Sequence, residues 1–261
     1  MTLTALAKHV AVDPRAMARW PQVAWLVSTQ MLELQQHIDQ VSQPYWLTLD
    51  DQRCILQTTQ ARHRPIGVDW LAKMSHWHQL PRRHHLLATA LSRAGVHPDQ
   101  VIVDATAGFG HDALSLLAIG CQVIAIERHP LVWVLLVTSY ELACQQSTIF
   151  AKLKGQIIHQ EAADWIQSTS EKIDTVFIDV MYPPSRTKAL NQRRMRVLRA
   201  MVGHDEDAKV LIGVARRVAR RQVVVKRPKD ASPMTSQAPD AVVALGGSTR
   251  CDIYYAHASF V

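Results

Sequence analysis

From residue 101 onwards the sequence alternates between short β-branched runs and longer segments with apolar residues at helical spacing. The predicted strands cover residues 101–103, 122–126, 157–159, 173–180 and 222–225, and the predicted helices between them cover residues 113–119, 131–144, 187–202 and 208–221. Short, continuous apolar strands separated by helices are typical of a parallel sheet that is buried on both faces. Two last runs, 242–244 and 251–255, predict an antiparallel pair around a Gly-Gly turn. The pattern therefore predicts a Rossmann-like α/β fold.

The first part of the chain has a different pattern. Two prolines interrupt its helical spacing, and a helix is predicted over residues 24–38. Strand-like runs at residues 45–49 and 54–58 flank a polar turn and predict a hairpin. We therefore expect a small α+β appendage over residues 1–70, ahead of a main α/β domain over residues 71–261.

Composition narrows the class of protein. The 261-residue chain is 48% hydrophobic and 20% charged, which is ordinary for a globular protein with a sizeable core. Its formal net charge of +7 favours a polyanionic partner such as a nucleic acid. The four cysteines are widely spaced without a C-x-x-C motif, so neither a metal site nor a disulfide framework is indicated. The sequence shows no signal peptide and no membrane-length apolar run, so we expect a soluble, cytoplasmic protein.

The most informative stretch is Val101–Asp112, in which a predicted strand runs into Asp104 and a loop containing Gly108 and Gly110. Glycine allows positive φ and close approach of a ligand, and the start of the following helix favours an anionic group. Residues 108–113 also match the G-x-G-x-x-A fingerprint, so the loop alone fits a dinucleotide as well. Asp104 favours another cofactor, because a carboxylate there repels a pyrophosphate but binds an ammonium such as that of S-adenosylmethionine. The alternative is that Asp104 caps the amides of its own loop.

Acidic residues follow other predicted strands too. Glu127 ends the second strand, where a carboxylate accepts hydrogen bonds from the hydroxyls of an adenosine ribose. The alternative for Glu127 is an ordinary surface residue. Asp179 ends the fourth strand, and the carboxyl ends of parallel strands share one edge, so we expect Asp104, Glu127 and Asp179 to converge there. Asp164, after the third strand, is either an adenine contact or a helix N-cap.

Several basic side chains are candidates for contacts to nucleic-acid phosphates: Arg82, Arg83, Arg193, Arg196, Lys226 and Arg227. The first two lie in a stretch rich in His, with a Trp, which otherwise indicates a solvated loop and helix start. The next two lie on the polar face of a predicted helix, and the last two follow a buried strand. Such contacts predict binding that weakens as salt rises.

Six motifs, in order along the chain, resemble one known family. They are VIVDATAGFGHDAL, IERHP, VFIDVMYPP, MRVLRAMVG, VVVKRP and RCDIYYA. Together they resemble the ribosomal RNA small-subunit methyltransferase J family over about residues 45–261. The resemblance implies the class I S-adenosylmethionine-dependent methyltransferase fold. It also implies methylation of the exocyclic 2-amino group of a guanosine in small-subunit (16S) ribosomal RNA, with that RNA or the small ribosomal subunit as partner.

The resemblance assigns further cofactor contacts to His111, Asp112, Glu127, Arg128, Asp179, Glu161 and Ala162. The last two stand where the family pattern leads us to expect small hydroxyl residues, and His111 stands in place of an arginine. Methyl transfer to an amine depends mainly on alignment and needs no metal. Asp179 and the Val180 carbonyl are expected to accept the hydrogens of the guanine amine, and Tyr182 to stack on the extruded base. The alternative for Tyr182 is packing before the Pro-Pro turn.

Three other functions stay open at this point. A methyltransferase acting on another RNA, on DNA or on protein shares nearly all of these motifs. A non-catalytic RNA-binding protein with a vestigial cofactor fold would bind the cofactor without turnover. A nicotinamide dehydrogenase would share the glycine loop, but it would leave Asp104 and Asp179 unexplained.

Overall fold

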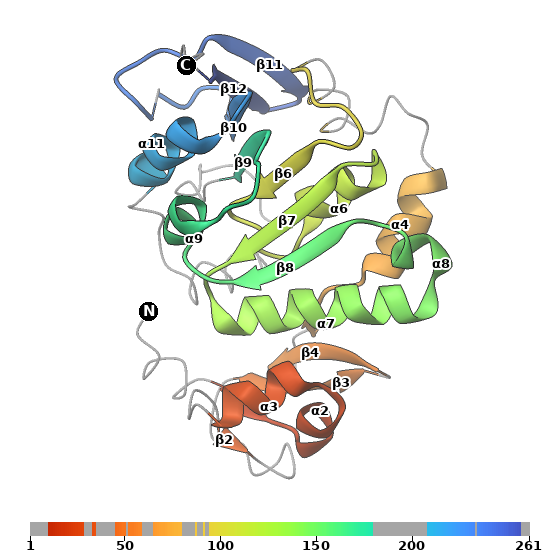
Figure 1. Ribbon diagram of the computed structural model, residues 1–261. Helices are drawn as coiled ribbons and strands as arrows, with labels where there is room; N and C mark the ends of the chain where they lie inside the picture. The colour runs from red at the N-terminus through yellow and green to blue at the C-terminus, as the bar shows by residue number, and fades with distance from the viewer. Residues whose placement is uncertain are drawn as a thin grey trace. The chain divides into compact units, whose positions relative to one another are not determined.

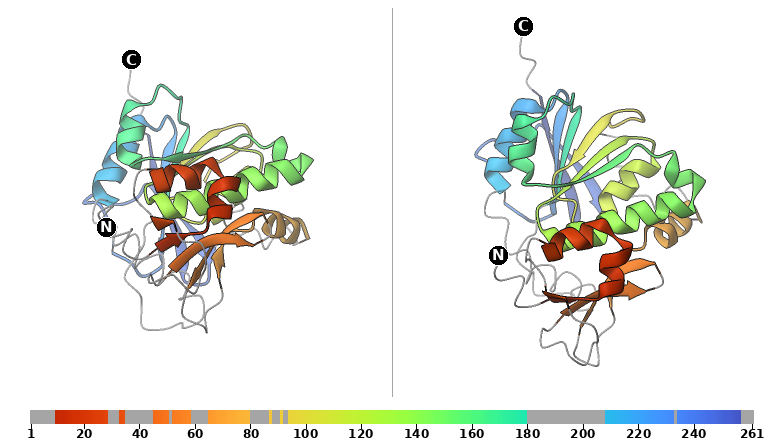
Figure 2. Two further views of the ribbon diagram at one scale, coloured as in Figure 1. Left: turned by 90° about the horizontal axis from the view of Figure 1, so that it is seen from below. Right: turned by 60° about the horizontal axis from the view of Figure 1, so that its bottom comes forward.

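The computed structural model describes residues 10–28, 33–34, 45–50, 52–58, 65–79, 87, 91, 94–179, 208–232 and 234–256. These residues form two compact units. One contains the described residues of Met1–Leu71 and His129–Ala151, and the other those of Ala72–Arg128, Lys152–Pro183 and His204–Val261. Figure 1 labels the elements, and Figure 2 shows them from two further directions.

The second unit is built on a seven-stranded sheet in the order β11-β12-β10-β9-β6-β7-β8 (Figure 1). Its strands are β6 (Val101–Asp104), β7 (Gln122–Glu127), β8 (Gly155–His159), β9 (Thr175–Asp179), β10 (Gln222–Pro228), β11 (Ala241–Gly246) and β12 (Thr249–Tyr255). The strands from β6 to β10 run parallel, whereas β12 is antiparallel to both β10 and β11. The predicted parallel α/β sheet with an antiparallel last pair is therefore confirmed.

Helices cover both faces of this sheet. They include α6 (His111–Ala118), α9 (Ala162–Ser168) and α11 (Ala208–Val218). The chain crosses the sheet in one direction from β6 to β7 and in the other from β8 to β9, so right-handed crossovers place α6 and α9 on opposite faces. The side chains of α9 and α11 form one core with alternate residues of the strands, among them Val103, Ile178 and Val225. The strand order reverses between β6 and β9, the place where open α/β sheets bind ligands.

The first unit contains a five-stranded sheet in the order β2-β1-β3-β4-β5. Its elements are β1 (Val10–Val12), α2 (Pro14–Arg19), α3 (Pro21–Ser28), β2 (Glu33–Leu34), β3 (Tyr45–Asp50), β4 (Arg53–Thr58), β5 (Ile66–Gly67), α7 (Pro130–Gln146) and α8 (Thr148–Ala151). Helix α4 (Trp70–Gln79) begins in this unit and continues into the other. Strands β3 and β4 form the predicted antiparallel hairpin.

The helical prediction for the N-terminal region is only partly correct. The described helix ends at Ser28, and Glu33 and Leu34 form β2 instead of continuing it. Pro14 and Pro21 do not break helices but are the first residues of α2 and α3. Proline is favourable there because the N–H groups of the first helical turn make no intrahelical hydrogen bond.

Helix α7 packs against α3 and β4 within the first unit. Gln22 donates a hydrogen bond to Glu141 at 2.7 Å, and the rings of Trp25 and Trp133 meet edge to face with centroids 5.6 Å apart. Helix α7 thus belongs to the first unit, although along the chain it lies between β7 and β8 of the large sheet. The domain boundary near residue 70 stays a prediction. Within the described part of the chain, no helix has the length and apolar character needed to cross a membrane.

Candidate cofactor and catalytic site

The carboxyl edge of the large sheet carries three acidic residues. Asp104 ends β6, Glu127 ends β7 and Asp179 ends β9. These strands are parallel neighbours, so their last residues lie at the same edge, as the strand pattern predicts. This edge is where the sheet order reverses, and it is therefore the candidate ligand site.

The loop between β6 and α6 has the backbone conformation that its glycines suggest. Gly108 has φ 54° and Gly110 has φ 70°, both in the left-handed region where a Cβ is strained. The amide of Gly108 donates a hydrogen bond to the Glu127 carboxylate at 2.8 Å, which ties the loop to β7. Gly110 directly precedes α6 and supplies no side-chain cap. The loop therefore leaves backbone room for a ligand at the start of α6.

Asp104 is almost completely buried, with 1% of its surface exposed. Its Oδ1 accepts a hydrogen bond from the Thr106 amide at 3.3 Å, whereas its Oδ2 has no partner among the residues that the structure describes. Burial, together with the nearby charge of Asp112, raises the pKa of Asp104 well above its ordinary value. A buried carboxylate oxygen without a donor is costly unless a cation reaches it. The loop-capping alternative accounts for one oxygen only, and the ammonium contact predicted for Asp104 stays a prediction for the other.

Strand alternation explains which charged side chains meet. Val103, Ile178 and Val225 point into the core shared with α9 and α11. The next residues of the same strands, Asp104, Asp179 and Lys226, therefore point to the face that α6 covers. There α6 presents Asp112, the second residue of the helix.

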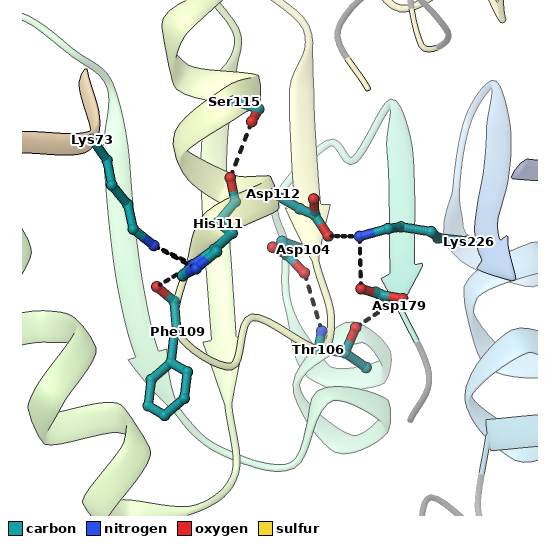
Figure 3. Close-up of polar contacts among 9 residues, drawn as sticks. All are labelled: Lys73, Asp104, Thr106, Phe109, His111, Asp112, Ser115, Asp179 and Lys226. Carbon is teal, nitrogen blue, oxygen red and sulfur yellow. Dashed lines mark hydrogen bonds and ion pairs between the residues drawn. The ribbon is translucent and has the colours of Figure 1, made fainter. Parts of the chain in front are cut away.

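Lys226 bridges two of these carboxylates (Figure 3). Its Nζ lies 2.7 Å from Asp112 Oδ2 and 2.8 Å from Asp179 Oδ2. The Asp179 amide donates a hydrogen bond to Thr106 Oγ1 at 2.7 Å, so the end of β9 is attached to the glycine loop. Burial raises the pKa of Asp179 to about 6, although Lys226 opposes the shift. Burial also works against the charged form of Lys226, but the two carboxylates outweigh it and raise the pKa of Lys226.

The residues predicted to contact the adenosine lie at the ends of β7 and β8. Glu127 is buried, with 6% exposed, which excludes an ordinary surface residue. The Arg128 guanidinium lies 3.7 Å from the Glu161 carboxylate. The Arg128 carbonyl lies 3.1 Å from His159 Nε2, and burial lowers the pKa of His159. These contacts hold the ends of β7 and β8 together beside Glu127.

Helix α9 begins at the end of the third predicted strand. Glu161 is its N-cap residue, and Ala162 is its buried first residue. Asp164 is the third residue of the helix and is exposed, so the N-cap alternative for Asp164 is wrong. An acidic residue in the first turn still suits the helix dipole.

His111 is exposed at the first position of α6. The ammonium of Lys73, from α4, lies 2.8 Å from His111 Nδ1, and the Phe109 carbonyl lies 3.3 Å from the same nitrogen (Figure 3). Sequence reasoning missed Lys73, because an isolated lysine in an amphipathic segment carries no motif. Only the packing of the second unit brings it to the start of α6.

The candidate phosphate contacts have different outcomes. Arg227 is buried, pairs with Asp252 at 2.9 Å and donates to the Ser232 carbonyl. It alternates with Lys226 along β10 and points to the opposite face of the sheet, so it is removed from the surface candidates. The predicted residues Arg82, Arg83, Arg193, Arg196 and Tyr182 lie outside the described residues. Among the described residues, no group of three or more His, Cys, Asp or Glu side chains is arranged to hold a metal ion.

Comparison with known proteins identifies the family. A family model described as "Putative SAM-dependent methyltransferase" matches residues 28–256. A protein named Ribosomal RNA small subunit methyltransferase J from Coxiella burnetii is 37% identical over 192 residues, which is 73% of this chain and 74% of that protein. The chain belongs to the ribosomal RNA small-subunit methyltransferase J family. A relative of the same name from Thioalkalivibrio sulfidiphilus is 35% identical over 196 residues, 73% of this chain and 76% of that protein.

A solved structure agrees with this assignment. The SAM-dependent methyltransferase from Neisseria gonorrhoeae superposes with a TM-score of 0.71 at 26% identity, covering 96% of this chain and 97% of that one. The predicted family, the Rossmann-like methyltransferase fold and the use of S-adenosylmethionine are confirmed. The J-family assignment makes this protein a SAM-dependent methyltransferase rather than a nicotinamide dehydrogenase.

Proposed function

We propose that this methyltransferase modifies the exocyclic 2-amino group of a guanosine in small-subunit ribosomal RNA. The names of its relatives support the RNA class, and the net charge of +7 suits a polyanionic substrate. The observation that carries the chemistry is the placement of Asp179. Its side chain is 38% exposed at the carboxyl end of β9, next to the strand end that carries Asp104. With ribosomal RNA as substrate, the enzyme would work in the cytoplasm on the small subunit or its RNA.

S-adenosylmethionine, when bound, supplies a methyl group activated by its sulfonium. Asp104 would accept hydrogen bonds from the cofactor ammonium, and Glu127 from the ribose hydroxyls. The other proposed cofactor contacts are Gly108, Gly110, His111, Asp112, Arg128, Glu161, Ala162, Asp164 and Asp179. Holding both reactants in line can contribute about 7–11 kcal/mol to the lowering of the barrier, so most of the catalysis is alignment.

The acceptor amine needs help because its lone pair is delocalised into the guanine ring. A carboxylate that accepts an N–H hydrogen bond favours the form in which the nitrogen presents its lone pair. Asp179 is the proposed acceptor, assisted by the carbonyl of Val180, while Tyr182 stacks on the extruded base. The amine nitrogen would take the methyl group that the sulfonium gives up, and the amine proton would pass to Asp179 or to solvent. The products are the 2-methylamino guanosine and the demethylated thioether.

Transfer of labelled methyl groups tests this proposal. Small ribosomal subunits, naked ribosomal RNA, transfer RNA and DNA are offered to the wild type, to Asp179→Asn and to the control Glu171→Gln. Glu171 is exposed and precedes β9, at the opposite edge of the sheet. We expect 2-methylamino-guanosine in small-subunit RNA from the wild type and the control, and a large loss with Asp179→Asn. Label in another nucleic acid would overturn the substrate, and full activity of Asp179→Asn would overturn the catalytic role.

A further inference from the structure

The ion-paired cluster of Lys226, Asp112 and Asp179 joins three elements at the proposed active edge. Lys226 belongs to β10, Asp112 to α6 and Asp179 to β9. In the parallel ladder Lys226 is the register partner of Asp179, so the two side chains stand side by side on one face. The side chains are 24%, 18% and 38% exposed for Lys226, Asp112 and Asp179, respectively, so Asp179 is the member most open to a substrate.

In the described part of the chain, three elements packed beside Asp179 contribute charges around it. Asp104 faces it from β6, Asp112 from α6 and Lys226 from β10. On the far side of Lys226, β12 places Cys251 at the paired register position. Burial raises the pKa of the Cys251 thiol to about 12, so that thiol is neutral. Among these groups, Lys226 is the single positive charge facing three carboxyl groups.

We propose that Lys226 is a positioning residue that keeps Asp179 as an ionised acceptor aimed at the substrate amine, with Asp112 as the second anchor of its ammonium. This proposal rests on the proposed catalytic role of Asp179. The two pairs, at 2.7 and 2.8 Å, fix the ammonium between α6 and β9, and the ammonium in turn fixes one oxygen of Asp179. The other oxygen of Asp179 is then the one that receives the substrate N–H.

The proposal gives Lys226 a role different from the phosphate contact suggested by its sequence position. A phosphate contact contributes to RNA affinity and to its salt dependence. A positioning residue instead controls the protonation and orientation of Asp179. Without the cation, the neighbouring carboxyl groups repel one another, and this repulsion favours the protonated form of Asp179. Loss of a positioning residue therefore changes kcat and the pH profile, whereas loss of a phosphate contact changes KM.

The first experiment uses the protein without cofactor or RNA. The carboxyl carbons of ¹³C-labelled aspartate are titrated by NMR in the wild type and in Lys226→Met, Lys226→Arg and Asp112→Asn, and Asp179→Asn assigns the signal. We expect Lys226→Met to raise the Asp179 midpoint by about 1–3 pH units. Asp112→Asn should lower it, and Lys226→Arg should leave it nearly unchanged. If the titration midpoint of Asp179 is the same as in the wild type in both Lys226→Met and Asp112→Asn, the proposal is overturned, and this result does not depend on the identity of the substrate.

The second experiment measures methyl transfer to small-subunit RNA between pH 5 and 8.5. Starting from a midpoint of about 6, a rise of about 1–3 units lowers the ionised fraction at pH 7 by roughly 2- to 90-fold. We therefore expect Lys226→Met to lose kcat to this extent at pH 7 and to recover as the pH rises, with KM and the salt slope unchanged. Lys229→Met, an exposed lysine just beyond β10, is the matched control.

The outcomes separate this inference from the proposed function. If the wild type methylates the RNA and Lys226→Met raises KM and flattens the salt slope without moving the pH midpoint, Lys226 is a phosphate contact and the inference fails. If the wild type methylates none of the RNAs, the proposed substrate fails, while the NMR midpoints still test the cluster. Thermal unfolding of each variant in the same buffers distinguishes a displaced midpoint from a damaged fold.

Discussion

Replacing Asp104 by asparagine tests the cofactor assignment most directly. The change keeps the shape of the side chain but removes the charge from a carboxylate whose Oδ2 has no partner in the described structure. If that oxygen receives the ammonium of S-adenosylmethionine, the substitution removes a charge-assisted hydrogen bond. Hydrogen bonds to charged groups contribute about 1.5–3 kcal/mol. We therefore expect the Kd for S-adenosylmethionine to rise by about 10- to 150-fold.

Calorimetric titration with two ligands isolates the group responsible. Methylthioadenosine retains the adenosine and the sulfur but lacks the amino-acid part, so it has no ammonium. The affinity of Asp104→Asn for methylthioadenosine should equal that of the wild type, and only the binding of S-adenosylmethionine should weaken. Equal weakening of both ligands, or a change in S-adenosylmethionine affinity below about twofold, would refute the assignment of Asp104.

The pH dependence of stability provides a check on folding. Burial and nearby negative charge raise the pKa of Asp104 in the folded protein above its value in the unfolded chain. Asp104 therefore contributes most stability below its unfolded pKa, and that contribution is lost as the pH rises through the folded pKa. At neutral pH the unliganded Asp104→Asn variant should be at least as stable as the wild type, and its advantage should disappear in acid. Thermal unfolding from pH 4 to 8 measures this difference, and an Asn variant that is less stable at pH 8 contradicts it.

Three further predictions follow from other parts of the structure. Glu127→Gln should weaken both S-adenosylmethionine and methylthioadenosine by about 1.5–3 kcal/mol, because both ligands carry the ribose hydroxyls; calorimetry in which only one ligand weakens would contradict the ribose role. Gly110→Ala should destabilise the protein by about 1–2 kcal/mol, since alanine is strained at φ 70°, and unchanged denaturant unfolding would show that the loop relaxes. Arg227→Met should destabilise the protein by about 3–5 kcal/mol, because buried Asp252 loses one of its positively charged partners. The salt dependence of RNA binding should stay that of the wild type, and a flatter slope would show that Arg227 contacts phosphate after all.

Much of the site follows from strand periodicity and parallel topology. A β-branched run that ends in an acid, followed by glycines, predicts both a buried strand and a carboxylate at its end. Parallel strands then bring Asp104, Glu127 and Asp179 to one edge without knowledge of any long-range contact. The errors arose where local patterns are ambiguous. The apolar spacing after Ser28 fits a helix, but the described residues there pair in a sheet. A proline in the sequence is compatible both with a break in a helix and with the first residue of one.

Lys226 and Arg227 show what the sequence alone leaves open. The two basic residues are adjacent and chemically alike, and both are plausible phosphate contacts in the sequence. In the structure their side chains point to opposite faces of the sheet. Lys226 forms ion pairs with Asp112 and Asp179 on one face, whereas Arg227 is buried on the other and pairs with Asp252. Which carboxylate lies opposite each cation depends on the register of β10 with its neighbours.

Short-range periodicity and the direction of parallel strands are enough to predict the local elements, the glycine loop and the sheet edge that carries the acidic residues, so these features follow from the amino-acid sequence. The pairing of charges, in contrast, depends on long-range packing. The partner of a side chain such as Lys226 lies 114 residues away at Asp112, and strand register and helix packing, set by the burial of the whole core, select it. The same reason explains why the contact between Lys73 and His111 was not predicted, since a contact between distant segments does not change the residue pattern of either segment.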